Sequence, residues 1–299
     1  ALQELAREKN SVVTVGTFDG IHLGHRAILH ELTTRARERA GRGIVFTFDP
    51  HPREVVGKGD VRWLTTLEER VELLNGTGVD VVFVIPFSFE FSRMSSREFF
   101  ERYVVHGVGV SEVIVGYDHM FGRDREAGIH ELRLLGEEHR FGISVVDPVS
   151  LRGKIVSSSR IRELLTNGEA EHACEYLGRP YALSGTVIRG VGRGAALGFP
   201  TANILPDHPH QLVPGDGVYC VRVQAGRERQ GGMLNIGRRP TFTPGGADRT
   251  IEAHLFGFAG SLYGERLRIE FLRRIRSEQQ FLTTEQLTQQ LHRDREECL

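Results

Sequence analysis

Two histidines, His22 and His25, lie three residues apart in a glycine-rich stretch near the start of the chain. An apolar, β-branched run over residues 11–15 precedes them and predicts a buried strand, and residues 26–40 carry apolar side chains at helical spacing. The stretch is therefore predicted to be a strand-to-helix turn, with both imidazoles near the unpaired N–H groups of the helix start. Two imidazole donors there suit a polyphosphate. A glycine-rich turn with two surface histidines is the alternative.

The string GTFDGIHLGH over residues 16–25 resembles the H-x-G-H signature of the nucleotidyltransferase superfamily, and more specifically the FAD synthetase module of prokaryotes. Enzymes of that superfamily attack the α-phosphate of ATP or CTP and release pyrophosphate. The resemblance implies an α/β, Rossmann-like domain in which His22 and His25 are catalytic. It also implies nucleotide or phosphate contacts from four residues of the turn, namely Gly16, Thr17, Phe18 and Gly24.

A serine run later in the chain could add to a phosphate site. Ser158 or Ser159 is predicted to cap the helix that follows, and hydroxyls at a helix start, with Arg162 one turn on, also bind phosphate. The string SSSRIR over residues 157–162 resembles the superfamily's S-S-T-x-x-R motif, with Ser159 at the usual threonine. This resemblance implies that the three residues hold the triphosphate opposite the two histidines.

Two further loops follow predicted strands. The loop over residues 116–123 resembles the family's G-x-D/N-F-x-F-G pattern, with His119 where phenylalanine is commoner. Asp118 is a nucleotide contact if the resemblance holds, and otherwise an ordinary turn residue. The string DPHP over residues 49–52 is similar to a family loop near the flavin, although its prolines alone indicate only a stiff loop.

The loop over residues 190–203 carries a second candidate site. Thr201 and Asn203 alternate along a predicted strand onto one face, where hydroxyl and amide oxygens suit Mg²⁺. A glycine-rich hairpin followed by a polar strand is the alternative. The string GFPTAN closely resembles the riboflavin kinase signature, and IEAH resembles that family's strand whose glutamate, here Glu252, is the catalytic base. Ala195 stands where the family has arginine. The resemblance implies phosphate contacts from four loop residues, namely Gly192, Gly194, Gly198 and Pro200.

The elements that must position these residues change in kind along the chain. From residue 11 to about 150, predicted strands and helices alternate, which indicates a parallel sheet covered on both faces. The sequences Thr65-x-x-Glu68 and Ser95-x-x-Glu98 predict capping boxes. Beyond about residue 180, six short strands separated by glycine and proline predict a small antiparallel β-barrel or sandwich, followed by a terminal helix. We expect domains over residues 1–180 and 181–299.

The composition of the chain excludes several classes of protein and of binding site. A net charge of −1 over 299 residues lacks the strong positive charge that is typical of proteins that bind nucleic acid. None of the three lysines completes a G-x-x-x-x-G-K-[ST] loop, which excludes a P-loop kinase. The three cysteines, Cys174, Cys220 and Cys298, are widely spaced and odd in number, so we expect neither a disulfide framework nor a zinc site. No apolar run is long enough for a membrane span, so a cytoplasmic protein is expected.

The hypothesis that joins both resemblances is a bifunctional enzyme. It would phosphorylate riboflavin to FMN with ATP and then adenylylate FMN to FAD, using ATP as co-substrate and Mg²⁺ as cofactor. A riboflavin kinase with an inactive nucleotidyltransferase-like domain is the first alternative. A flavin-binding regulatory protein and a cytidylyltransferase with an unrelated barrel are the others, and neither explains GFPTAN together with Glu252.

Overall fold

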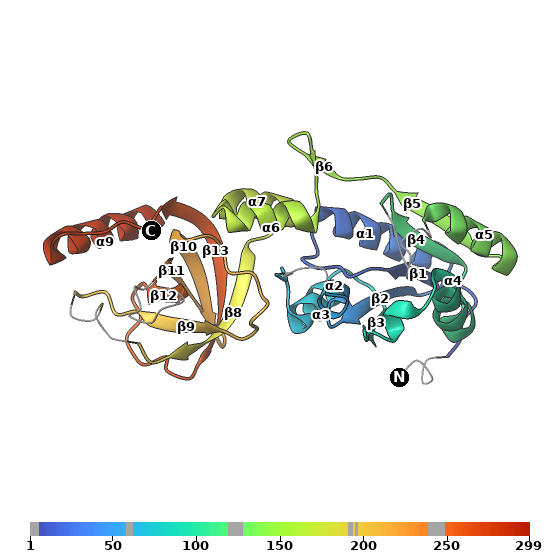
Figure 1. Cartoon of the computed structure of the whole chain (residues 1–299), viewed down its shortest axis with the longest axis horizontal. Coiled ribbons are helices and arrows are strands. Elements are labelled where there is room, and N and C mark those ends of the chain that lie inside the picture. The colour runs from blue at the N-terminus through green and yellow to red at the C-terminus, as the bar shows by residue number, and fades with distance from the viewer. Residues whose placement is uncertain (1–5, 58–61, 119–127, 191–193, 195–196, 239–248) are drawn as a thin grey trace. The chain divides into compact units, whose positions relative to one another are not determined.

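The computed structural model describes residues 6–57, 62–118, 128–190, 194, 197–238 and 249–299 (Figure 1). Its contacts divide the chain into two compact units. The first comprises residues 1–61 and 65–157, and the second comprises 62–64 and 158–299.

The first unit is built on a five-stranded parallel sheet in the order β3-β2-β1-β4-β5. This order is doubly wound, because the chain progresses outward in both directions from the centre, and it confirms the predicted Rossmann-like class. A short antiparallel hairpin, β6–β7, follows the sheet. The strands are β1 (Val12–Val15), β2 (Gly43–Asp49), β3 (Val81–Pro86), β4 (Glu112–Gly116), β5 (Gly142–Val146), β6 (Ser150–Leu151) and β7 (Lys154–Ile155).

Helices cover both faces of the sheet (Figure 1). Side chains alternate along β1, so Val12 packs with Leu29 and Leu32 of α1 on one face, and Val13 packs with Phe99 and Phe100 on the other. The helical segments are α1 (Leu23–Glu38), α2 (Pro52–Val55), α3 (Leu67–Asn75), η2 (Phe91–Arg93), α4 (Ser96–Phe99), the π-helical η3 (Phe100–Val108) and α5 (Ile129–His139).

Two helix starts differ from the prediction. The capping box predicted at Ser95 and Glu98 is present, but the other one uses Thr66 and Glu69, one residue later than predicted. Thr65 is engaged elsewhere, because its hydroxyl contacts the turn before α1. Helix α6 (Ser158–Thr166) includes Ser158 as its first residue, so Ser158 and Ser159, the two predicted caps, both lie within the helix.

The second unit contains a closed antiparallel barrel in the order β10-β11-β12-β9-β8-β13, which confirms the barrel. Helix α7 packs against β13 and β8. The remaining elements are α7 (Ala170–Leu177), β8 (Tyr181–Ile188), β9 (Ala202–Pro206), β10 (Gly217–Ala225), β11 (Glu228–Arg238), β12 (Arg249–Leu255), β13 (Arg266–Arg276) and α9 (Thr284–Cys298). Thr283 caps α9, the predicted terminal helix, by accepting a hydrogen bond from the backbone N–H of Gln286.

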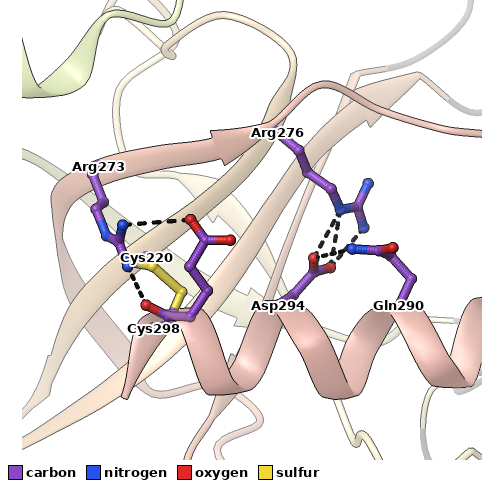
Figure 2. The surroundings of a disulfide bond; sticks show 7 residues. Cys220, Arg273, Arg276, Gln290, Asp294 and Cys298 are labelled. Atoms are coloured by element: carbon purple, nitrogen blue, oxygen red, sulfur yellow. Dashed lines mark hydrogen bonds and ion pairs between the residues drawn. A yellow bond between two sulfur atoms is a disulfide. The ribbon is translucent and has the colours of Figure 1, made fainter.

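The expectation of no disulfide is wrong. Cys220 on β10 and Cys298 at the end of α9 form a disulfide across 78 residues of sequence (Figure 2). Their Cα atoms lie 5.2 Å apart, within the ordinary range for a disulfide. Spacing along the sequence gave no sign of this pair, since the barrel strand and the last helix turn meet only in the fold. Cys174 keeps a free thiol.

Candidate active sites

The turn between β1 and α1 holds the histidine pair in one arrangement. His22 is the N-cap of α1, and its Nδ1 accepts a hydrogen bond of 3.3 Å from the backbone N–H of His25. The two rings stack with centroids 3.7 Å apart. A Cβ on Gly24 would lie 3.3 Å from the His22 ring, a tight contact that glycine avoids. The turn therefore aims both imidazoles from the positive end of one helix.

The same turn carries unusual backbone conformations that other residues hold in place. Phe18 has φ 49° and Ile21 has φ 39°, values that side chains other than glycine rarely adopt. Buried Asp19 accepts hydrogen bonds from the N–H of Thr65 at 3.0 Å and from its hydroxyl at 3.1 Å. The Thr65 hydroxyl also accepts a 3.0 Å bond from the N–H of Gly20. Strained backbone held by its surroundings is typical of functional turns.

Other predicted residues of the first site lie at the same edge of the sheet. Gly16 follows β1 and Gly116 ends β4, and these neighbouring strands mark the point where the strand order reverses. A Cβ on Gly116 would lie 3.4 Å from the Asp118 carboxylate, which therefore folds back over the end of β4. Ligands of doubly wound sheets bind at this place. Ser158, Ser159 and Arg162 occupy the first turns of α6, in the segment grouped with the barrel.

A cavity of about 350 Å³, a size suited to a small molecule, lies between barrel strands and the C-terminal segment that includes α9. Its wall includes Thr201 and Glu252, with Asn235 and His254 beside them. The hydroxyl of Thr201 lies 3.5 Å from a carboxylate oxygen of Glu252. The structure therefore brings together one predicted metal ligand and the predicted base.

Register explains why polar side chains gather around Glu252. On β12, Glu252 is directly opposite Asn235 of β11 and Asn203 of β9. Residues opposite one another in a sheet project from the same face, so the three side chains form one row across three strands. Asn203 also packs over Gly190, where a Cβ would lie 2.0 Å from its amide nitrogen.

The glycine-rich loop comes close to this row. A Cβ on Gly194 would lie 2.3 Å from the carbonyl oxygen of Phe199, so only glycine fits there. Gly198 has φ +78°. The His254 ring contacts the carbonyl oxygen of Pro200 at 2.8 Å and so connects this loop to β12. Gly192 and Ala195 lie outside the described residues, as does His119 of the earlier loop.

Two residues near the sites were missed at the sequence level. Arg70 and Asp294 belong to no motif, and their positions follow from packing. An Asp or Arg in a helix is usually a solvated charge, whereas Asp294 is 1% exposed and Arg70 is 4% exposed. Only the fold could reveal them.

An acidic cluster in the first unit has a different explanation. Glu101, Glu138 and His139 have ligand atoms close enough for a metal ion. However, Arg97 donates to Glu101 at 3.1 Å and to Glu138 at 2.8 Å, and it already neutralises these carboxylates. We therefore do not count it as a metal centre.

A doubly wound unit with paired histidines at its strand-order switch, followed by a barrel whose cavity holds a carboxylate, defines a two-module transferase that uses nucleotides. The FAD synthetase family model matches residues 4–160, and the riboflavin kinase family model matches residues 177–299. The chain belongs to the family of bifunctional riboflavin kinase/FMN adenylyltransferases. Because both modules are present, the bifunctional hypothesis holds over a kinase alone.

Relatives support this assignment over nearly the whole chain. A bifunctional riboflavin kinase/FMN adenylyltransferase of Listeria monocytogenes is 36% identical, covering 96% of this chain and 91% of the relative. One from Bacillus subtilis is 34% identical, covering 98% of this chain and 92% of the relative. Riboflavin, FMN, FAD and ATP are the small molecules that fit this family.

A solved structure shares the whole fold. A protein from Streptococcus pneumoniae described as a macrolide-efflux protein matches with a TM-score of 0.90 and 30% identity, covering 99% of this chain and 95% of that chain. Within the described part of the present chain, no helix combines the length and apolarity needed to cross a membrane.

Proposed function

We propose that the barrel cavity is the site of riboflavin phosphorylation and that Glu252 is its base. The observation that carries this proposal is the 3.5 Å contact between Glu252 and the Thr201 hydroxyl in the cavity wall. The nucleophile is an alcohol, so a positioned carboxylate accelerates the reaction, typically by about 10²–10⁴-fold. Glu252 takes the hydroxyl proton as the oxygen bonds to the γ-phosphorus of ATP, and ADP leaves.

The oxygen donors beside Glu252 fit Mg²⁺. Thr201 offers a hydroxyl and Asn203 an amide oxygen, and both are hard ligands of the kind that Mg²⁺ prefers. We assign these two residues to the metal, which when bound would neutralise phosphate charge. The phosphate chain of ATP then follows the glycine-rich loop through Gly192, Gly194, Gly198 and Pro200.

The parallel-sheet unit carries FMN adenylylation in this proposal. The FMN phosphate is already anionic, so its attack on the α-phosphorus needs charge stabilisation rather than a base, and pyrophosphate leaves. His22 and His25 are the donors at the reacting phosphate. The assigned nucleotide and triphosphate contacts are Gly16, Thr17, Phe18, Gly24, Asp118, Ser158, Ser159 and Arg162.

We also propose the domain boundaries and the cellular location of the enzyme. Residues 1–180 and 181–299 are the two functional domains, and the enzyme works in the cytoplasm, where its co-substrate ATP is available.

The test is to incubate the protein with riboflavin, ATP and Mg²⁺ and to separate the flavins by chromatography. We expect FMN to appear first and FAD to follow, and a chelator to stop the first step. Unchanged riboflavin in the presence of Mg²⁺ would contradict the kinase assignment, and FMN that accumulates without FAD would contradict the adenylyltransferase assignment.

A further inference from the structure

The disulfide joins the barrel wall to the helix that borders the kinase cavity. Cys220 on β10 is 4% exposed, whereas Cys298 in the last turn of α9 is only half-buried. A reductant in solvent can therefore approach the bond from the Cys298 side. Figure 2 shows the bond at one end of α9 and a second attachment, through Arg276 and Asp294, one turn away.

Helix α9 shapes the cavity directly. Three residues of the helix line the cavity together with Glu252 and Thr201, namely Leu287, Leu291 and Asp294. The helix also contacts the glycine-rich loop over residues 190–203, since the ring centroids of His292 and Phe199 lie 5.0 Å apart. A change in how tightly α9 is held would therefore alter the apolar cavity wall and the segment leading to Thr201.

Polar contacts also hold the C-terminal half of this helix. Asp294 is the buried residue of α9, and it accepts hydrogen bonds from Arg276 at 2.7 Å and from Gln290 at 2.8 Å. In the last turn, Arg273 forms an exposed ion pair with the Glu297 carboxylate at 3.4 Å and donates a hydrogen bond to the Glu297 backbone carbonyl. Exposed ion pairs contribute little to stability, so the disulfide supplies the covalent restraint on the last turn of α9, beyond the buried Arg276–Asp294 pair.

We propose that Cys220 and Cys298 form a reversible thiol–disulfide site that controls riboflavin binding in the kinase cavity. This inference rests on the proposed kinase function of the barrel. In the cytoplasm, disulfides are usually transient. The thiolate of a small reducing dithiol from solvent attacks one sulfur of the Cys220–Cys298 disulfide, and the S–S bond breaks. The disulfide gains two electrons and two protons to give two thiols, and the dithiol becomes a cyclic disulfide. Release of α9 then lowers the fraction of molecules with a closed cavity, which raises the apparent KM for riboflavin.

The experiment compares oxidised wild-type protein with protein reduced by dithiothreitol, with the thiol state followed by alkylation and mass spectrometry. Riboflavin phosphorylation and FMN adenylylation are measured separately. Cys298→Ser removes the bond permanently, and Cys174→Ser is the matched control. Burial raises the pKa of the Cys174 thiol, and mass spectrometry distinguishes the alkylated peptide of Cys174 from those of Cys220 and Cys298.

We expect reduction to raise the riboflavin KM roughly fivefold or more with FMN adenylylation unchanged. Cys298→Ser should match the reduced protein under both conditions, and Cys174→Ser should respond as wild type does. An equal riboflavin KM for fully oxidised and fully reduced protein would overturn the proposal, as would separate thiols after oxidation. Absence of FMN formation in both states would overturn the kinase assignment itself, and this inference with it.

Discussion

Arg70 donates a hydrogen bond of 2.9 Å to the backbone carbonyl of Thr17, the residue that opens the histidine turn. The same guanidinium donates to the carbonyl of Phe48 at 3.0 Å, so one buried cation on α3 holds the chain after β1 to the end of β2. Burial lowers the pKa of Arg70, and the nearby Asp19 and Asp49 carboxylates partly oppose that effect. The turn that presents His22 therefore depends on a charge outside any recognisable motif.

Arg70→Met should weaken both the fold and the adenylyl transfer. Hydrogen bonds from charged groups contribute about 1.5–3 kcal/mol each, so we expect the free energy of unfolding to fall by about 2–3 kcal/mol. The KM for ATP in FMN adenylylation should rise, while riboflavin phosphorylation continues. Arg70→Lys keeps the charge without the planar fork and should be intermediate. Arg133→Met, at an exposed position of α5, is the control. Wild-type stability and adenylylation in Arg70→Met would contradict the role of Arg70 in supporting the histidine turn.

His22→Ala should lose most FAD formation and retain riboflavin phosphorylation. Removal of one preorganised donor typically lowers turnover by about 10²–10³-fold. Because His22 also caps α1, alanine should cost about 1 kcal/mol of stability as well. His22→Asn separates the two effects, since asparagine is a good N-cap without an imidazole. It should restore stability but not turnover, and His30→Ala on the exposed face of α1 should resemble wild type. Parallel loss of both activities would contradict the assignment of this turn to adenylylation.

Asn203→Ala should raise the Mg²⁺ and ATP concentrations needed for riboflavin phosphorylation and lower turnover. The reason is the loss of one hard oxygen ligand beside Glu252. Rates measured across a Mg²⁺ titration check this, with the exposed Asn167→Ala as the control. Identical titrations for Asn203→Ala and wild type would exclude Asn203 from the metal site.

Two fragments test the domain proposal. Residues 181–299 contain the complete proposed kinase site and should convert riboflavin to FMN without making FAD. Because α7 packs against β13 and β8, a fragment starting at Ser158 should be more resistant to thermal unfolding than one starting at Tyr181. Circular dichroism and flavin chromatography on both fragments give the answer. A folded fragment without kinase activity would mean that the first unit completes the site.

The sequence predicted the elements better than the contacts between distant residues. The alternation of apolar runs and helical patterns predicted the parallel sheet over residues 11 to about 150, because buried parallel strands are short apolar runs bounded by turn residues. The shift from Thr65 to Thr66 at the α3 cap could not be seen, because both threonines precede a glutamate by three residues. What decided between them is the tertiary contact of Thr65 with Asp19.

In both candidate sites, the residues that stand in motifs could be predicted from the sequence. The residues that lie beside them in the fold could not. His22 and Glu252 stand in recognisable strings, but the position of Asn235 opposite Glu252 depends on the register of β11 with β12. The pairing of Cys220 with Cys298 likewise depends on where the last helix packs. Neither register nor helix packing leaves a local pattern in the chain.

We propose two separate sites for the two reactions, with Glu252 acting in only one of them. The most direct measurement supplies Glu252→Gln with either riboflavin or FMN, together with ATP and Mg²⁺, and quantifies the flavins formed. Glutamine is close in size to glutamate but cannot take the hydroxyl proton, and Glu228→Gln on the exposed part of β11 is the matched control. We expect Glu252→Gln to make no FMN from riboflavin and to convert supplied FMN to FAD at the wild-type rate. Wild-type riboflavin phosphorylation by Glu252→Gln, or loss of both reactions in a folded protein, would contradict it.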